Sequence, residues 1–170
     1  MPPEKKSIIN FISSDSCFDL QFRKDTRHER TNSPTYYRWK AQFVVTAPKK
    51  NLKILEKIKK ELKCGDISVS KDQARFSVQK IDDITDIIIP YFRKNCLPIL
   101  EGSLNNKKKD FELWVKGVEI IKKNKGKYLT NWKKTDLHCL VEIHKSSAKY
   151  KHRVRSCKWL DIARTLAKSL

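Results

Sequence analysis

The stretch IINFISSDSCFDLQF, residues 8–22, changes its hydrophobic pattern partway along, and this change fixes the first two elements. The first half has the apolar spacing of one helix face and predicts a short helix over residues 7–16, with apolar positions Ile8, Ile9, Phe11 and Ile12. From Phe18 onward apolar and polar residues alternate, which is the period of a half-buried strand. Asp15 therefore lies where a helix passes into a strand.

The pattern continues with a clear strand over residues 36–46. One face carries Tyr37, Trp39, Ala41, Phe43 and Val45, and the other carries Arg38, Lys40, Gln42 and Val44. Such a cationic outer face fits either nucleic acid or plain solvent.

The next segments complete a repeated order of elements. A helix over residues 52–62 ends at Cys64-Gly65 and is followed by a hairpin, Asp66–Ser70 with Ala74–Gln79. Helical spacing returns over 81–89, stops at Pro90, and recurs near 111–121 and 131–144, while 24–35 and 100–109 have the composition of loops. The order α-β-β-α-β-β-α with extra helices predicts an α+β fold.

The charge balance favours a polyanionic partner. Lys and Arg number 38 against 19 Asp and Glu, a formal net charge of +19 spread along 170 residues. Phosphate neutralised by such side chains releases counterions and gives affinity; a solvated basic coat is the alternative. No segment has the ~18 apolar residues of a membrane-spanning helix, and five scattered cysteines favour a reducing, intracellular compartment, either an organelle or a microbial cytoplasm.

Asp15 is the candidate for chemistry. A carboxylate beside phosphate can hold Mg²⁺, which takes oxygen ligands and keeps several waters. Two such ions can assist an in-line phosphodiester displacement. Asp is also common as a turn or capping residue, so the residue type alone leaves both interpretations open.

Residues 10–18, NFISSDSCF, resemble a degenerate LAGLIDADG motif, commonly written G-F-I-D-A-D-G-S-F. Phe11, Ile12, Asp15 and Phe18 match it, whereas Asn10 and Ser16 replace the glycines and Ser13 replaces the first acidic residue. The order and spacing of elements over residues 7–145 are similar to those of the family as well. The resemblance implies an αββαββα fold with a saddle-shaped antiparallel sheet, preceded by a leader over residues 1–6 and followed by a basic helical extension over 146–170.

The resemblance also implies roles for particular residues. Asp15 becomes the catalytic, metal-binding carboxylate, and Lys107 becomes the active-site lysine, with Lys108 as a fallback because the preceding loop is long. A family position that is often Gln falls on Ala47. Strand residues expected to face DNA are Arg23, Lys24, Arg38, Lys40, Gln42, Ser68, Ser70, Arg75, Ser77 and Gln79.

A single motif per chain implies a homodimer, because family members pair two motif helices over the scissile bonds. The expected interface residues are Ile8, Asn10, Phe11 and Ile12, with a buried pair of Asn10 side chains as a hypothesis. The expected function is Mg²⁺-dependent hydrolysis of duplex DNA at a pseudo-palindromic site. The alternatives are a DNA-binding relative that does not cut, a group I intron RNA maturase, or a basic ribosome- or RNA-associated protein.

Overall fold

The computed structural model describes residues 1–25, 36–100, 105–150 and 160–168. Its first half runs α1 (Pro3–Asp15), β1 (Ser16–Asp25), β2 (Tyr36–Pro48), α2 (Leu52–Leu62), β3 (Asp66–Val69) and β4 (Gln73–Val78). A short 3-10 turn, η1 (Lys49–Asn51), leads into α2. The expected order of helices and strands is confirmed. Most of the expected loop after β1 falls on 26–35, outside the described residues.

The second half is helical. A continuous helical course comprises α3 (Ile81–Asp83), η2 (Ile84–Ile88), α4 (Ile89–Tyr91), η3 (Phe92–Cys96) and α5 (Leu97–Leu100). It is followed by α6 (Asn105–Lys123), the turn η4 (Leu129–Asn131), α7 (Lys134–Tyr150) and α8 (Leu160–Lys168). No described helix is long and apolar enough to cross a membrane.

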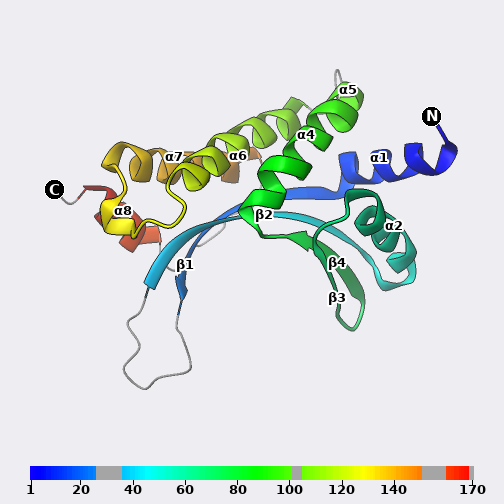
Figure 1. The fold of residues 1–170 in the computed structure, drawn as a ribbon, viewed down its shortest axis with the longest axis horizontal. Helices are drawn as coiled ribbons and strands as arrows, with labels where there is room; N and C mark the ends of the chain where they lie inside the picture. The colour runs from blue at the N-terminus through cyan, green and yellow to red at the C-terminus, as the bar shows by residue number, and fades with distance from the viewer. Residues whose placement is uncertain (26–35, 101–104, 151–159, 169–170) are drawn as a thin grey trace.

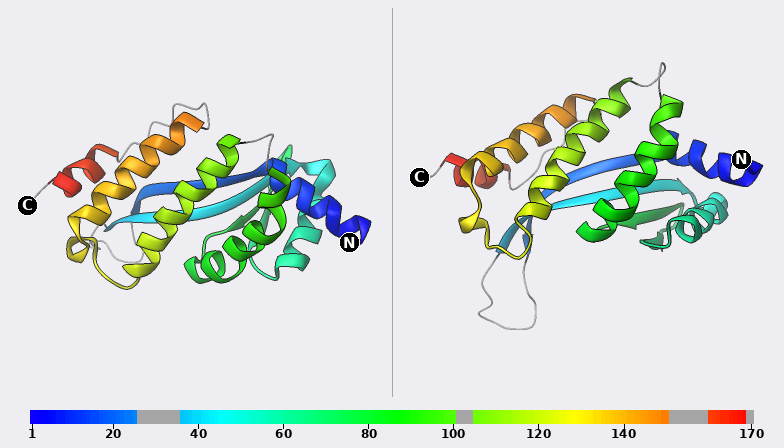
Figure 2. Two further views of the ribbon diagram at one scale, coloured as in Figure 1. Left: turned by 90° about the horizontal axis from the view of Figure 1, so that it is seen from above. Right: turned by 45° about the horizontal axis from the view of Figure 1, so that its top comes forward.

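The four strands form one antiparallel sheet in the order β1-β2-β4-β3. Figure 1 shows β1 and β2 as long, curved strands with α4, α5, α6 and α7 above them, while α2 lies beside the β3–β4 hairpin. The views of Figure 2 show the same layer of helices crossing one face of the sheet. This arrangement is the expected α+β fold with an open antiparallel sheet.

The alternation of residues in the strands separates the two faces of the sheet. Phe18, Phe43 and Phe76 belong to the helix-covered set and are almost completely buried. Phe18 contacts the rings of Phe92, Phe111 and Trp114 at centroid distances of 5.1, 5.3 and 5.1 Å. This aromatic cluster ties the sheet to α6 and to the helical course before it. The opposite face carries the polar residues of the same strands.

Two glycines lie where a side chain from another element approaches the backbone closely. Gly65 follows α2 with φ +82°, and a Cβ there would lie 2.6 Å from the Phe76 ring. Gly117 on α6 would place a Cβ 3.2 Å from Leu20 of β1. A larger side chain at Gly65 would clash with Phe76 and strain the backbone, whereas one at Gly117 would require Leu20 to shift by a few tenths of an ångström.

Three predicted boundaries were wrong. α1 begins at Pro3, so most of the expected leader is helical, because Pro is accepted in the first turn of a helix. Pro90 does not end its helix: it lies after a π-helical turn, whose wider i→i+5 bonding accommodates a residue that lacks an N–H. The lysine run at 107–109 lies on α6 rather than in a loop.

Candidate active site and nucleic-acid interface

Asp15 is the last residue of α1, and its side chain is exposed to solvent. The helix stops there because Ser16 is extended, with φ −76° and ψ 150°, and pairs with Val45 as the first residue of β1. The hydroxyl of Ser14 donates to Asp15 Oδ2 at 2.6 Å. The carboxylate is thus oriented by its neighbour and open to a ligand.

Lys107 reaches this helix end from the start of α6. Its Nζ donates to the backbone carbonyl of Ser14 at 3.0 Å, across 93 residues of sequence. Burial lowers the pKa of the half-buried ammonium from 10.5 to about 8, although the nearby charge of Asp15 acts in the opposite direction. A cation and a carboxylate therefore meet at the point where α1 enters the sheet.

Lys108 is exposed on the same turn of α6. The two candidate lysines have different surroundings, because the charges of Cys17, Cys96 and Asp110 also act on Lys107 and raise its pKa. Lys107 is the lysine that the tertiary structure brings to Asp15.

Two of the residues that depart from the motif, Ser13 and Ala47, are buried in the structure. Ser13, at the first acidic position, is 3% exposed and donates to the Ile9 carbonyl at 2.7 Å. It also contacts the Cys96 thiol, whose pKa burial raises to about 11. Ala47 is buried on the helix-covered side of β2, so this position offers no polar group to a substrate.

Two buried acidic residues were missed by the sequence reasoning, one close to Lys107 and one on the polar face of the sheet. Asp110 is buried on α6, where it accepts a hydrogen bond from Ser147 at 2.6 Å and lies close enough to Lys107 to affect it. Asp19 is buried on the polar face of β1 and accepts from Gln21 at 3.3 Å. The sequence contained a signal for Asp19, because this residue alternates with Gln21 and Arg23 as on one face of a strand. It contained none for Asp110, whose partner Ser147 is brought close by the packing of α7 on α6.

The residues expected to face DNA mostly share the polar face of the sheet. Cross-strand pairs place together Arg23 with Arg38, Gln21 with Lys40, and Ser68 with Arg75. The strand alternation adds Gln42 and Ser77, and Ser70 and Gln79 lie one residue beyond β3 and β4. Lys24 pairs with Tyr37, and its side chain lies outside the described part of the structure.

Two side chains at the centre of this polar face form a hydrogen bond with each other. Arg75 donates to Gln42 Oε1 at 3.1 Å, although the two residues come from different strands. Gln42 is 5% exposed and Arg75 is exposed. An arginine fixed by an amide keeps further N–H donors for phosphate or base edges.

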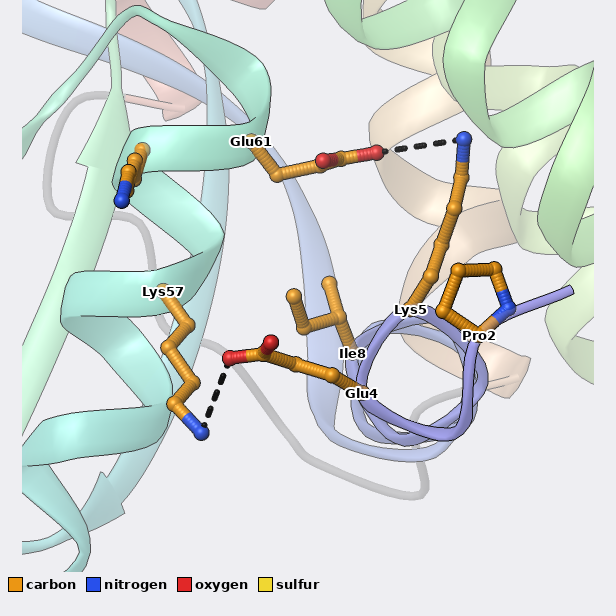
Figure 3. A pocket seen from close by; sticks show the side chains of 7 residues that line it. Pro2, Glu4, Lys5, Ile8, Lys57 and Glu61 are labelled. Atoms are coloured by element: carbon orange, nitrogen blue, oxygen red, sulfur yellow. Dashed lines mark ion pairs between the residues drawn. The ribbon is translucent and has the colours of Figure 1, made fainter.

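The N-terminal half of α1 is fixed against α2. Figure 3 shows Lys57 directed toward Glu4 and Lys5 toward Glu61, at 3.1 and 3.5 Å, around a small pocket that Ile8 and Pro2 also line. These exposed ion pairs add to the packing of the buried Ile9 and Ile12, which holds α1 in the core.

Of the residues expected at a dimer interface, two belong to the chain's own core. Ile8 and Ile12 are 5% and 1% exposed, whereas Asn10 is exposed and Phe11 is half-buried. Ser7 and Ser14 are exposed too, and with Asn10 and Phe11 they lie on one face of the helix. The surface left for another helix is therefore narrow and made mostly of small polar side chains.

Within the described ranges, no three His, Cys, Asp or Glu side chains converge to hold a metal ion. Asp15 brings one carboxylate to the site. Mg²⁺ in phosphate-processing sites is commonly held by one or two carboxylates together with water and substrate oxygens, so the donor chemistry of Asp15 fits a shared site.

A curved, open antiparallel sheet with one helix-covered face and one polar face, entered through α1, defines the α+β class of this protein. The family model for the LAGLIDADG endonuclease matches residues 8–118. The chain belongs to the LAGLIDADG endonuclease family. No curated protein sequence matches it.

Solved structures support the fold. The I-SmaMI LAGLIDADG homing endonuclease bound to cleaved DNA has 20% identity and a TM-score of 0.69, over 98% of this chain and 49% of that one. The homing endonuclease I-TnaI has 13% identity and a TM-score of 0.67, over 99% and 100%. The meganuclease I-AabMI bound to uncleaved DNA has 23% identity and a TM-score of 0.65, over 91% and 47%. The chain thus spans about half of I-SmaMI and I-AabMI.

Proposed function

We propose that this protein is a divalent-metal-dependent endonuclease that acts as a homodimer on both strands of a pseudo-palindromic DNA duplex. The observation that carries the proposal is the hydrogen bond from Lys107 to the Ser14 carbonyl, which brings a cation beside the carboxylate of Asp15. Support also comes from the family match and from similarity to structures bound to DNA.

Asp15 is the proposed metal-binding residue. Its carboxylate is exposed at the end of α1 and oriented by the Ser14 hydroxyl. Magnesium, when bound, supplies a Lewis acid for phosphodiester hydrolysis. The similar protein I-SmaMI was solved on uncleaved DNA in the presence of calcium ions, and calcium is a hard divalent cation of the same ligand preference.

Lys107 is the proposed stabiliser of negative charge on the reacting phosphate. Its ammonium is fixed by the Ser14 carbonyl and retains two further N–H donors. A preorganised cation in a partly water-excluded site stabilises developing charge more strongly than a solvated one. With a pKa of about 8, most Lys107 side chains carry their proton at pH 7.

The proposed homodimer follows from one Asp15 per chain. Cutting two strands requires two such carboxylates, and a second copy supplies the other. The chain covers all of I-TnaI and about half of I-SmaMI, so one copy of this fold corresponds to about half of the longer protein. The exposed face of α1, with Ser7, Asn10, Phe11 and Ser14, is the proposed contact, and an Asn10 pair across the axis would hydrogen-bond when buried.

The test uses a randomised duplex library incubated with the protein and Mg²⁺, followed by sequencing of the cut ends. We expect paired cuts at related sites for the wild type, and at least about a hundred-fold slower cutting for Asp15→Asn. Glu119→Gln is the charge-matched control, because Glu119 is exposed on α6. Binding without cutting by the wild type would reject the enzyme assignment, and equal rates for Asp15→Asn and the control would reject the site.

The alternative is a LAGLIDADG-like DNA-binding protein that does not cut, or an RNA maturase. The buried Ser13 at the first acidic position and the buried Ala47 at the usual Gln position favour it. Splicing or tighter binding of a structured intron RNA, with no cutting of any library member, would support that alternative.

A further inference from the structure

The hydroxyl of Ser14 has one proton to donate and several acceptors close by. Its oxygen lies 2.6 Å from Oδ2 of Asp15, 3.1 Å from the carbonyl oxygen of Asn10 and 3.3 Å from that of Phe11. A hydroxyl that donates to an ionised carboxylate typically forms a bond of about 2.5 to 2.7 Å, shorter and stronger than a bond to a neutral oxygen. The proton of Ser14 therefore goes to the carboxylate of Asp15.

The hydroxyl of Thr85 provides an internal comparison, because it has the same kinds of neighbour. It lies 3.0 and 3.1 Å from the carbonyl oxygens of Ile81 and Asp82, and 3.2 Å from Oδ1 of Asp86. The backbone acceptors are nearer here than the carboxylate, and bonding to an earlier carbonyl is common for Ser and Thr inside helices. The short contact at Ser14 is therefore not a general result of placing a hydroxyl before an Asp in a helix.

Ser14 also contacts the second functional group of the candidate site. Its backbone carbonyl accepts the hydrogen bond from Lys107 at 3.0 Å, so the residue meets the carboxylate through its side chain and the ammonium through its main chain. The motif that residues 10–18 resemble has alanine at this position, so the hydroxyl is not part of that motif. Groups that hydrogen-bond a metal-binding carboxylate fix its orientation, and their loss typically lowers metal affinity or activity by about 10- to 100-fold.

We propose that Ser14 is a positioning residue for Asp15: its hydroxyl holds Oδ2 and thereby presents Oδ1 to the divalent cation. The inference rests on the proposed function, because it assumes that Asp15 binds the metal. An exposed Asp side chain that samples several rotamers must be ordered when a cation binds, and the hydrogen bond from Ser14 removes part of that entropic cost in advance. In this role Ser14 acts through Asp15 and contacts neither the cation nor the phosphate.

The experiment measures Mn²⁺ binding to the whole protein without DNA, by water-proton relaxation, with Asp15→Asn defining the binding at other sites. We expect the Mn²⁺ dissociation constant to rise about ten-fold in Ser14→Ala, the lower end of the usual range, because the site is exposed. Ser14→Thr keeps the hydroxyl and should stay within about two-fold of the wild type. Thr85→Ala is the matched control and should do the same, because it removes the corresponding hydroxyl beside Asp86. Alanine is a strong helix former, so Ser14→Ala is expected to fold.

A second readout separates positioning from a general loss of structure. In single-turnover cleavage of a duplex recovered from the library, Ser14→Ala should need about ten-fold more Mg²⁺ for half of its maximal rate. Its rate at saturating Mg²⁺ should stay within about three-fold of the wild type, because the metal ligand and Lys107 are still present. A low rate that excess Mg²⁺ does not restore would contradict a positioning role.

The remaining outcomes distinguish this inference from the proposed function. Equal Mn²⁺ affinities for Ser14→Ala and the wild type would overturn the inference, while slow cutting by Asp15→Asn would leave the proposed function intact. Equal Mn²⁺ binding by Asp15→Asn and the wild type would reject both. An equal loss in Thr85→Ala would assign the effect to helix stability instead.

Dimerisation needs its own control, because Ser14 also lies on the proposed contact face of α1. Sedimentation of the same samples measures the fraction of dimer in each variant. We expect Ser14→Ala to bind Mn²⁺ more weakly at every protein concentration. A loss of affinity that disappears once the protein concentration restores the dimer would assign the effect to the contact between copies and overturn the inference.

Discussion

Lysine side chains make contacts at both ends of α1, two at the N-terminal half and one at the C-terminal end, yet their surroundings differ. At the N-terminal half, Glu4 and Lys5 of α1 form solvent-exposed ion pairs with Lys57 and Glu61 of α2. At the C-terminal end, a half-buried Lys107 from α6 donates to the Ser14 carbonyl beside Asp15. The same side-chain type therefore serves attachment at one end and a candidate chemical site at the other.

Solvent explains the difference. Exposed ion pairs gain little, typically about 0.2 to 1 kcal/mol, because water screens them and both side chains lose freedom. Burial makes the Lys107 charge costly, which is seen in its lowered pKa. A cost of this kind is common at functional sites, where a group is kept for chemistry rather than for stability. The contrast can be tested by mutation and by pH.

The largest effect is expected from Lys107→Met. Removal of the charge beside Asp15 should slow single-turnover cleavage of a duplex recovered from the library by about 10²- to 10³-fold, with binding nearly unchanged. Lys108→Met removes an equal charge from the exposed neighbouring position and should cost less than about five-fold. A larger loss for Lys108→Met would transfer the role to Lys108.

The second effect is on pH dependence. Because the folded pKa of Lys107 is about 8, its charged fraction falls above that pH, and the cleavage rate should drop about ten-fold per unit there. Lys107→Arg retains charge at these pH values and should abolish that drop if it cleaves at all. A wild-type rate independent of pH between 8 and 9.5 would contradict a role for the charged ammonium.

The same pKa has a consequence for stability. The unfolded chain holds the Lys107 proton up to about pH 10.5 and the folded chain up to about 8, so between these values the unfolded state binds more protons. This group therefore makes folding stability rise with pH in that window. Lys107→Met should gain on the order of 1 kcal/mol at pH 7, allowing for partial exposure, and lose this advantage by pH 10.5 in urea titrations.

A smaller effect is expected along the exposed face of α1. If two Asn10 side chains bond across a dimer axis, Asn10→Gly and Asn10→Ala should weaken dimerisation about five- to ten-fold in sedimentation experiments. The alanine variant controls for the low helix propensity of glycine. Unchanged or tighter dimers in both variants would end the hypothesis of an Asn10 pair.

The smallest effect is expected at the N-terminal half of α1. Glu4→Gln removes the exposed pair with Lys57 and should lower the free energy of unfolding by less than about 0.5 kcal/mol, and by less still in 1 M KCl. Chemical denaturation at both salt concentrations measures this. A loss above 2 kcal/mol would show that the two ends of α1 are not as different as proposed.

Much of the fold was predictable because local periodicity reports burial directly. The alternation in residues 36–46 separated Trp39 and Phe43 from Arg38 and Lys40, and the structure places these pairs on opposite faces of the sheet. The helix end predicted at Pro90 was wrong, although a proline usually ends a helix. Only the packed π-helical turn before Pro90 shows how the helix continues. The lysine run at 107–109 misled because its composition is that of a loop, while α6 is anchored by the buried Phe111, Trp114 and Val118 on its C-terminal side.

The sequence by itself determined the order of elements, the two faces of each strand and the excess of positive charge, because each is a property of neighbouring residues. It also placed Asp15 at a junction of helix and strand. Only the tertiary structure decided which lysine meets that carboxylate and that Ile8 and Ile12 belong to the core. These facts depend on contacts between segments far apart in the chain, and electrostatic effects such as the pKa of Lys107 arise from that packing rather than from local sequence.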